Sequence, residues 1–126
     1  MVSCAVVGLG MGFGSRAASR ADVARAKVEA KQVTVRFLNA LDRRHYDQAC
    51  SLLAHLFYRH NHVRGRKQCV IGFSVGMAGT RVQFHITRVD AATDKAKVHG
   101  VVDGEPGTVL LVREPPGFRV LDLQGA

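Results

Sequence analysis

Apolar and polar side chains recur with the period of a helix between Ser19 and Leu41. Apolar residues are spaced three or four apart, and polar residues follow the same spacing on the opposite face. The apolar positions are Ala26, Ala30, Val33, Phe37 and Leu41, and the polar positions are Glu29, Gln32, Arg36, Asn39 and Arg43. The pattern predicts one long amphipathic helix, capped by Ser19 or Asp22. We expect its Ala-rich first half, residues 21–31, to project as a stalk.

A basic turn at residues 42–45 separates this helix from a second one, predicted from Tyr46 to about Tyr58. One face of the second helix carries Tyr46, Ala49, Cys50, Leu53 and either Leu56 or Phe57. Residues 59–67 form a basic loop, and the apolar residues 68–77 are interpreted as a short third helix. Two glycines weaken that helix, because each costs roughly 1 kcal/mol.

The period changes to strict alternation after residue 80, which predicts a half-buried strand at residues 81–89. Further strands are predicted at residues 95–102, 108–114 and 118–123, with turns at residues 90–94, 103–107 and 115–117. The face expected to point inward carries Val82, Phe84, Ile86, Val98 and Val102, all apolar. Successive hairpins make an antiparallel sheet. Because three helices precede the strands, the predicted fold class is α+β.

The composition indicates one basic domain. The chain has 126 residues, 47% of them hydrophobic, and 18 Lys and Arg against 10 Asp and Glu give a net charge of +8. This charge favours anionic partners such as phospholipid head groups or acidic polymers. Nucleic acid is not expected, because neither a recognition helix nor base-stacking aromatics accompany the charge. The clustered basic residues are the candidate anion-binding residues: Arg43, Arg44, Arg59, Arg64, Arg66 and Lys67.

Residues 1–14 are uncharged and mostly small and apolar, and three interpretations of them compete. The run Val6-Val7-Gly8-x-Gly10 is similar to a dinucleotide-binding loop, but the third glycine of that fingerprint falls on Phe13 and the chain is too short for a doubly wound sheet. We favour a signal or membrane segment, or a remnant of one, over residues 1–18. A disordered Gly-rich leader is the third interpretation. Residues 19–126 are predicted to form the single domain.

Short motifs follow one another in a fixed order between residues 31 and 123. They are Val35-x-Phe37-Leu38-x-x-Leu41, Tyr46-Asp47-x-Ala49-Cys50-x-Leu52-Leu53, Cys69, the strand at residues 82–89, Lys95-Ala96-x-Val98, Leu111-Val112-Arg113-Glu114 and Gly117-Phe118-Arg119-Val120. In this order they resemble the nuclear transport factor 2-like (SnoaL-like) superfamily, in particular the small extracytoplasmic members that follow a membrane anchor in actinobacteria. The resemblance implies a cone-shaped, cystatin-like roll, in which three helices lie across a curved sheet of about four strands and enclose a pocket.

The resemblance also implies a disulfide and a set of pocket residues. Relatives of this shape often carry a cysteine in the second helix and another at the third, which implies a disulfide between Cys50 and Cys69. The predicted pocket lining is Phe37, Leu41, Tyr46, Leu53, Phe57, Phe73, Phe84, Ile86 and Val98. The disulfide would place the domain outside the cytoplasm, anchored to a membrane or secreted. Free thiols at both positions would place it in the cytoplasm.

Residues that could bind a metal or act as a general acid or base are scattered along the sequence. His60-x-His62 lies in the basic loop, where neighbouring arginines would repel a dication, so no metal site is assigned. No cofactor and no catalytic residue is assigned either. The candidates for general acid–base chemistry, judged against enzymatic relatives, are Tyr46, Tyr58, His85, His99 and Asp103.

From these observations we expect a non-enzymatic, membrane-tethered or secreted domain that binds a small apolar ligand or an envelope protein. One alternative is a small SnoaL-like enzyme of the isomerase or dehydratase type. The other is a basic module that binds anionic polymers. Because dimers formed through the sheet face are common in the superfamily, a homodimer is a further prediction.

Overall fold

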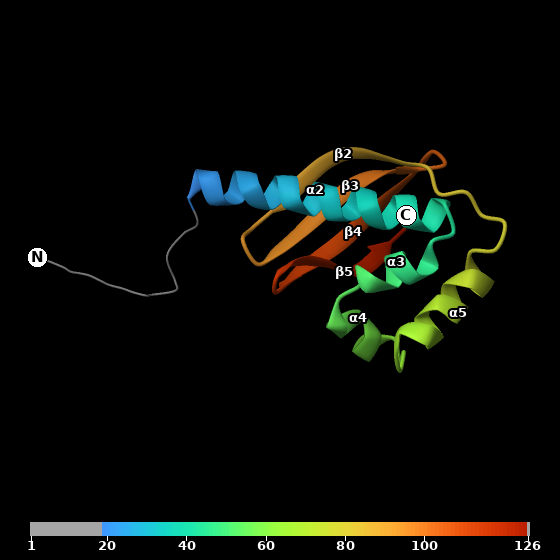
Figure 1. The fold of residues 1–126 in the computed structure, drawn as a ribbon. Helices are drawn as coiled ribbons and strands as arrows, with labels where there is room; N and C mark the ends of the chain where they lie inside the picture. The colour runs from blue at the N-terminus through green and yellow to red at the C-terminus, as the bar shows by residue number, and fades with distance from the viewer. Residues whose placement is uncertain (1–18, 126) are drawn as a thin grey trace, which may run out of the picture.

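The computed structural model describes residues 19–125, and the three interpretations of the N-terminal segment lie outside this range. The elements are α2 (Arg20–Asp42), α3 (Tyr46–Ser51), α4 (His55–His60), α5 (Arg66–Gly76), β2 (Phe84–Ala91), β3 (Lys95–Val102), β4 (Glu105–Glu114) and β5 (Gly117–Gln124). The strands form one antiparallel sheet in the order β2-β3-β4-β5, and the helices precede them in the chain (Figure 1). The predicted α+β fold class is therefore confirmed.

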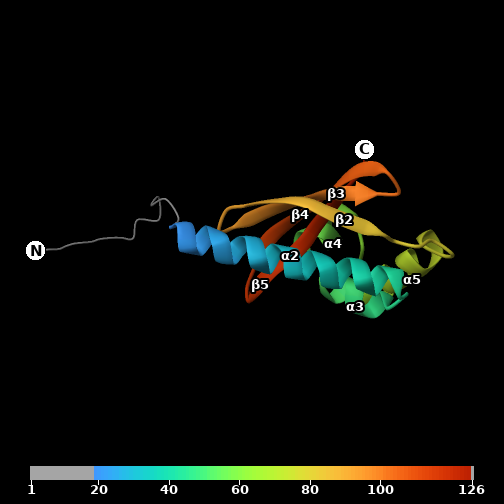
Figure 2. The same ribbon diagram turned by 90° about the horizontal axis from the view of Figure 1, so that it is seen from above.

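Helix α2 lies along one face of the sheet (Figures 1 and 2). Its N-cap is Ser19, whose Oγ accepts a hydrogen bond from the Asp22 N–H at 3.1 Å. All five residues of the predicted apolar stripe are buried. The expectation of a stalk over residues 21–31 is wrong from Ala26 onward, because Ala26 and Ala30 are buried in the core. The start of the helix extends past the sheet (Figure 1).

The predicted second helix is wrong as a single element, because it is divided into α3 and α4 at residues 52–54. The divided segment pairs with the edge strand β5 through a parallel bridge between Leu53 and Val120. The Ala54 N–H donates to the Val120 carbonyl at 2.7 Å, and the Val120 N–H donates to the Leu52 carbonyl at 2.8 Å. These bonds replace intrahelical ones, so the helix ends where β5 offers the backbone other partners.

The side chain of Glu114, at the end of β4, caps the N-terminus of α4. Its carboxylate accepts hydrogen bonds from the N–H groups of His55 at 2.8 Å and Leu56 at 3.4 Å. A carboxylate at this position satisfies N–H groups that the first turn leaves free and also suits the helix dipole. The cap comes from a residue 59 positions later in the chain, so the local pattern did not reveal it.

The strands follow the predicted alternation, with differences at their ends. Strand β3 coincides with the prediction for residues 95–102, whereas β2 continues to Ala91 and contains a register shift after Ile86 that is typical of a β-bulge. Strand β4 begins at Glu105, earlier than predicted. Only Asp103-Gly104 remains as the turn, and both residues have positive φ, 51° and 80°. This conformation suits a two-residue hairpin.

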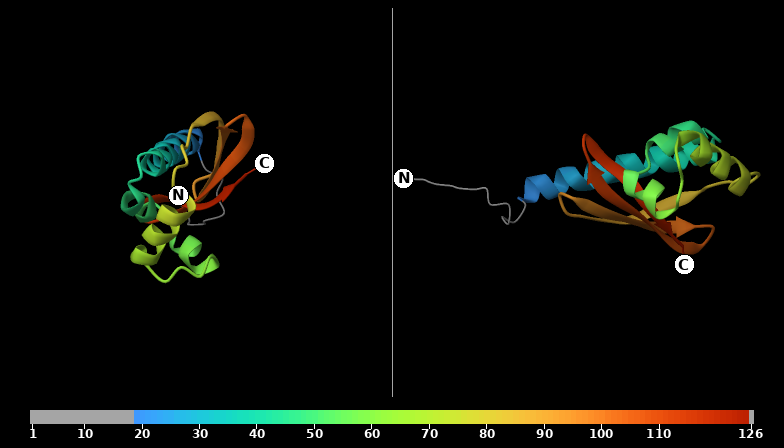
Figure 3. Two further views of the ribbon diagram at one scale, coloured as in Figure 1. Left: turned by 90° about the vertical axis from the view of Figure 1, so that its right-hand side faces the viewer. Right: turned by 90° about the horizontal axis from the view of Figure 1, so that it is seen from below.

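The core lies between α2 and the inner face of the sheet. Viewed end-on, α2 and the sheet form two layers, with α3, α4 and α5 gathered at one side (Figure 3). The largest fully buried apolar side chains of this core are Phe37, Leu111, Val98, Val109 and Val120. Helix and strands therefore contribute jointly to one core, as the spacing of apolar residues predicted.

A disulfide joins Cys50 of α3 to Cys69 of α5, whose Cα atoms are 6.1 Å apart. The pairing implied by the family resemblance is thus present in the structure. Cys69 is the only buried residue of α5. The partly buried ring of Phe73 adds contacts with the rings of Phe37 and Tyr46, at centroid distances of 6.2 and 6.3 Å. The disulfide and the two aromatic contacts of Phe73 therefore help to hold α5 against the domain.

Candidate functional site

A cavity of about 380 Å³ lies beside the C-terminal end of α2. It is bounded by α2, by α5 and the segment that follows it, by strands β2 to β4, and by the last described residues of the chain. Its apolar lining consists of Leu38, Leu41, Phe73, Met77, Val82, Phe84, Val102, Val109 and Leu123. Small-molecule sites in proteins span roughly 300–1,000 Å³, so this cavity has the size for a small ligand.

Part of the cavity wall is the ring of Phe84, which lies over two glycines of the sheet. Gly100 of β3 and Gly107 of β4 are register partners. A Cβ atom at Gly100 would lie 2.5 Å from Cζ of Phe84, and one at Gly107 would lie 3.8 Å from Cε1. A side chain at Gly100 would therefore push the ring away from the sheet and into the cavity.

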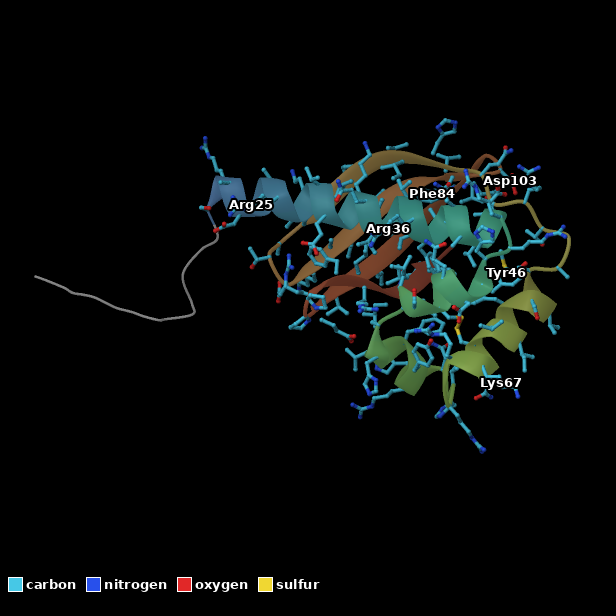
Figure 4. All side chains as sticks on the ribbon, in the orientation of Figure 1. Arg25, Arg36, Tyr46, Lys67, Phe84 and Asp103 are labelled. Atoms are coloured by element: carbon cyan, nitrogen blue, oxygen red, sulfur yellow. A yellow bond between two sulfur atoms is a disulfide. The ribbon has the colours of Figure 1, made fainter. Side chains whose placement is uncertain are left out.

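Asp42, the last residue of α2, bonds to two residues that line the cavity, Arg81 and Val82. Its Oδ1 accepts hydrogen bonds from Nε of Arg81 at 3.0 Å and from the Val82 N–H at 2.9 Å. The bond from Arg81, followed by that from Val82, lowers the pKa of Asp42 below the ordinary value of 3.8. These bonds fix the segment that leads into β2, which places Val82 against the cavity. The labelled Phe84 and Asp103 lie at this same end of the sheet (Figure 4).

The nine predicted pocket residues are divided between the cavity and the rest of the domain. Leu41, Phe73 and Phe84 line the cavity. Phe37, Leu53 and Val98 are buried in the core, and Tyr46, Phe57 and Ile86 are partly buried against it. The cavity residues that pattern analysis missed include Leu38, Met77 and Leu123. They come from the ends of three elements, where periodicity does not indicate which neighbours a side chain will meet.

The six predicted anion-binding residues do not form one group. Arg43 and Arg44 lie in the turn after α2, and Lys67 lies on α5 (Figure 4). The other three, Arg59, Arg64 and Arg66, border a separate hollow of about 490 Å³ beside α4 and the start of α5. Arg119 of β5 borders the same hollow, a position that no pattern in the sequence indicates.

The five acid–base candidates lie in different surroundings. The ring of Tyr46 stacks on that of Phe73. The Tyr58 hydroxyl donates a hydrogen bond to the Cys50 carbonyl at 3.0 Å. Asp103 lies at the edge of the apolar cavity. His85 is exposed on β2, whereas His99 joins a network on β3. No hydrogen bond among residues 19–125 connects two of the five, and no three His, Cys, Asp or Glu side chains of that range are arranged to hold a metal ion.

The network around His99 was not anticipated from the sequence. Its Nε2 lies 3.0 Å from Oδ2 of Asp90, and its Nδ1 lies 3.2 Å from Oγ1 of Thr108. The bond from His99, with a smaller contribution from Arg88, lowers the pKa of Asp90. His99 and its partners come from three adjacent strands. The network therefore ties these strands together on the face opposite the core.

The structure bears on location through its disulfide. The Cys50–Cys69 disulfide is compatible with a place outside the cytoplasm, because reducing compartments keep most thiols free. Within residues 19–125, none of the helices has the length and apolar character needed to cross a bilayer.

Comparison with known proteins shows the fold. The chain matches no protein-family model and no curated protein. Among solved structures, it is similar to a cystatin-like domain of unknown function from Nostoc punctiforme, with a TM-score of 0.54, 12% identity, and coverage of 86% of this chain and 78% of that one. It is also similar to a SnoaL-like protein of unknown function from Burkholderia thailandensis, with a TM-score of 0.55, 14% identity, and coverage of 86% and 97%. The predicted cystatin-like fold is thus confirmed.

Proposed function

We propose that this protein is a binding domain that takes a small apolar ligand into the cavity beside the end of α2. The observation that carries the proposal is the composition of the cavity wall, where aliphatic and aromatic side chains from helices and strands face a shared space of about 380 Å³. Transfer of an apolar ligand from water into such a space is favourable, at about 25 cal/mol for each Å² buried.

Polar side chains at the cavity edge favour a ligand with one polar end. Arg81, Asp103, Glu105 and Gln124 lie there and come from three different segments. A ligand that places its apolar body against Phe84 and a hydroxyl or amide toward this edge would satisfy both parts of the site. An envelope protein partner and tethering to a membrane remain predictions from the sequence.

Two tryptophan variants, one on each face of the sheet, test the proposal. Leu123 is 42% exposed and lines the cavity, whereas Val101 is 36% exposed and lies on the opposite face of the sheet. The probe is N-phenyl-1-naphthylamine, a neutral apolar fluorophore excited where tryptophan does not absorb. We expect saturable binding by the full chain, weakened about tenfold or more by Leu123→Trp and less than about twofold by Val101→Trp. Tenfold corresponds to about 1.4 kcal/mol, or roughly 55 Å² of lost apolar contact.

Two results would contradict the proposal. One is the absence of saturable probe binding by the native chain. The other is equal weakening by the two tryptophan variants, which would indicate adsorption to the general surface of the protein. Circular dichroism spectra of both variants verify that each is folded before binding is compared.

A further inference from the structure

Two adjoining hollows lie apart from the apolar cavity. The first, of about 470 Å³, is bounded by residues of α2, by the end of α3 and by the start of β5. The second, of about 490 Å³, is bounded by α4, by the loop before α5 and by the end of β4. They share Ser51, Arg66 and Arg119, so together they form one groove. None of the residues of this groove lines the apolar cavity.

The groove carries an excess of guanidinium groups. Arg36 borders the first hollow, Arg59 and Arg64 border the second, and Arg66 and Arg119 border both. Two carboxylates, Glu29 and Glu114, also border the groove. Five arginines against two glutamates leave an excess of three positive charges.

Both glutamates are already engaged by the fold. Glu29 pairs with Arg113 at 3.2 Å and accepts a hydrogen bond from the Phe118 N–H at 2.9 Å. Glu114 caps α4 through the His55 N–H at 2.8 Å. Their oxygens are therefore committed to other donors, and neither glutamate pairs with an arginine of the groove among the described residues.

The arginines are engaged to different degrees. Arg66 pairs with Asp47 at 3.2 Å, and Nη1 of Arg119 donates to the Ser51 carbonyl, which holds its guanidinium where the two hollows meet. No carboxylate of residues 19–125 lies within ion-pair distance of Arg36, Arg59 or Arg64. Like charges gathered in one groove repel one another, and an anion bound between them would relieve that repulsion.

We propose that this groove binds a phosphate-bearing anion. Guanidinium groups offer paired N–H donors that match two phosphate oxygens at once. A phosphate or diphosphate carries more than one negative charge, whereas a single carboxylate would leave most of the excess charge uncompensated. The same chemistry is offered by a free phosphorylated molecule and by the phosphate of a lipid head group.

Matched charge variants of the full chain test the groove. Arg36→Gln/Arg64→Gln removes one cation from each hollow. Arg43→Gln/Lys97→Gln removes two cations from exposed positions outside both hollows, so the net charge is the same. Calorimetric titration with pyrophosphate should show saturable binding by the native chain and the control, weakened about tenfold or more in the groove variant. The Leu123→Trp change should leave this binding intact, which separates the groove from the apolar cavity.

A second arm identifies the source of the phosphate. Flotation with phosphatidylcholine vesicles, with and without phosphatidic acid, measures binding to a head group. Pyrophosphate binding that depends on the groove supports a soluble ligand. Binding to phosphatidic acid vesicles alone, weakened in the groove variant relative to the control, supports a lipid head group. The proposal is overturned if neither phosphate source binds, or if the groove variant and its control weaken binding equally.

Discussion

Loss of the Cys50–Cys69 disulfide should lower the free energy of unfolding by about 3 kcal/mol. The bond closes a loop with a sequence separation of 19. The loop-closure entropy that such a bond removes from the unfolded chain amounts to about 11 cal/mol/K, or about 3 kcal/mol at 25 °C. Both cysteines are almost fully buried, at 1% and 5% exposure. Reduced thiols would therefore keep most of their packing, and the loss would come chiefly from the unfolded state.

Urea unfolding followed by circular dichroism measures this loss. The comparison uses oxidised and reduced protein in a Cys4→Ala background, which removes the third cysteine of the chain as a source of exchange. For a domain of this size, urea slopes are about 1–1.5 kcal/mol/M, so the midpoint should fall by roughly 2–3 M on reduction. The variant Cys50→Ala/Cys69→Ala should lose on the order of 1 kcal/mol more, because it also removes buried sulfur atoms.

Reduction should also allow α5 to open locally, because Cys69 is the only buried residue of that helix. Hydrogen exchange should then show amides of α5 losing protection on reduction, while those of α2 lose it only with global unfolding. The reasoning is refuted if the oxidised and reduced proteins unfold at the same urea concentration. It is also refuted if α5 keeps the protection of α2 after the bond is broken.

The remaining predictions concern substitutions of Gly100, Gly72 and Asp42. Gly100→Ala should destabilise the domain by about 1–3 kcal/mol, because the new methyl group overlaps the Phe84 ring and the His85 carbonyl. Gly72→Ala, in α5 with open space around it, should instead stabilise the domain by roughly 0.5–1 kcal/mol. Thermal unfolding of the two variants shows whether the first is less stable and the second more stable than the native chain. The pKa of Asp42 is lowered in the folded state, so its contribution to stability is present above its ordinary value of 3.8 and is lost as pH falls through the folded pKa. Asp42→Asn should therefore lose less stability than the native chain on acidification below pH 3.8, and equal losses in urea titrations across that range would contradict the assignment.

The spacing of apolar residues along the chain was sufficient to predict the elements that bury a single face against the core. The stripe from Ala26 to Leu41 predicted both a helix and its buried face, because a spacing of three and four places those side chains on one side of any α-helix. Alternation predicted the inward side chains of β3, for the corresponding reason in a strand. The disulfide was anticipated from family resemblance, since two cysteines in a sequence carry no information about their distance in space.

The division of the second helix and the position of both sites depended on tertiary structure. Residues 52–54 leave the helix because the Val120 backbone bonds to Leu52 and Ala54, and the Glu114 carboxylate then caps α4 at His55. The apolar cavity joins Leu38 to Leu123, and the basic groove joins Arg36 to Arg119. Periodicity describes the face of one element, whereas a cavity or a groove is made where several elements fail to fill the space between them. The sequence alone therefore determined the class of fold and its core, and packing of distant segments determined where a ligand could bind.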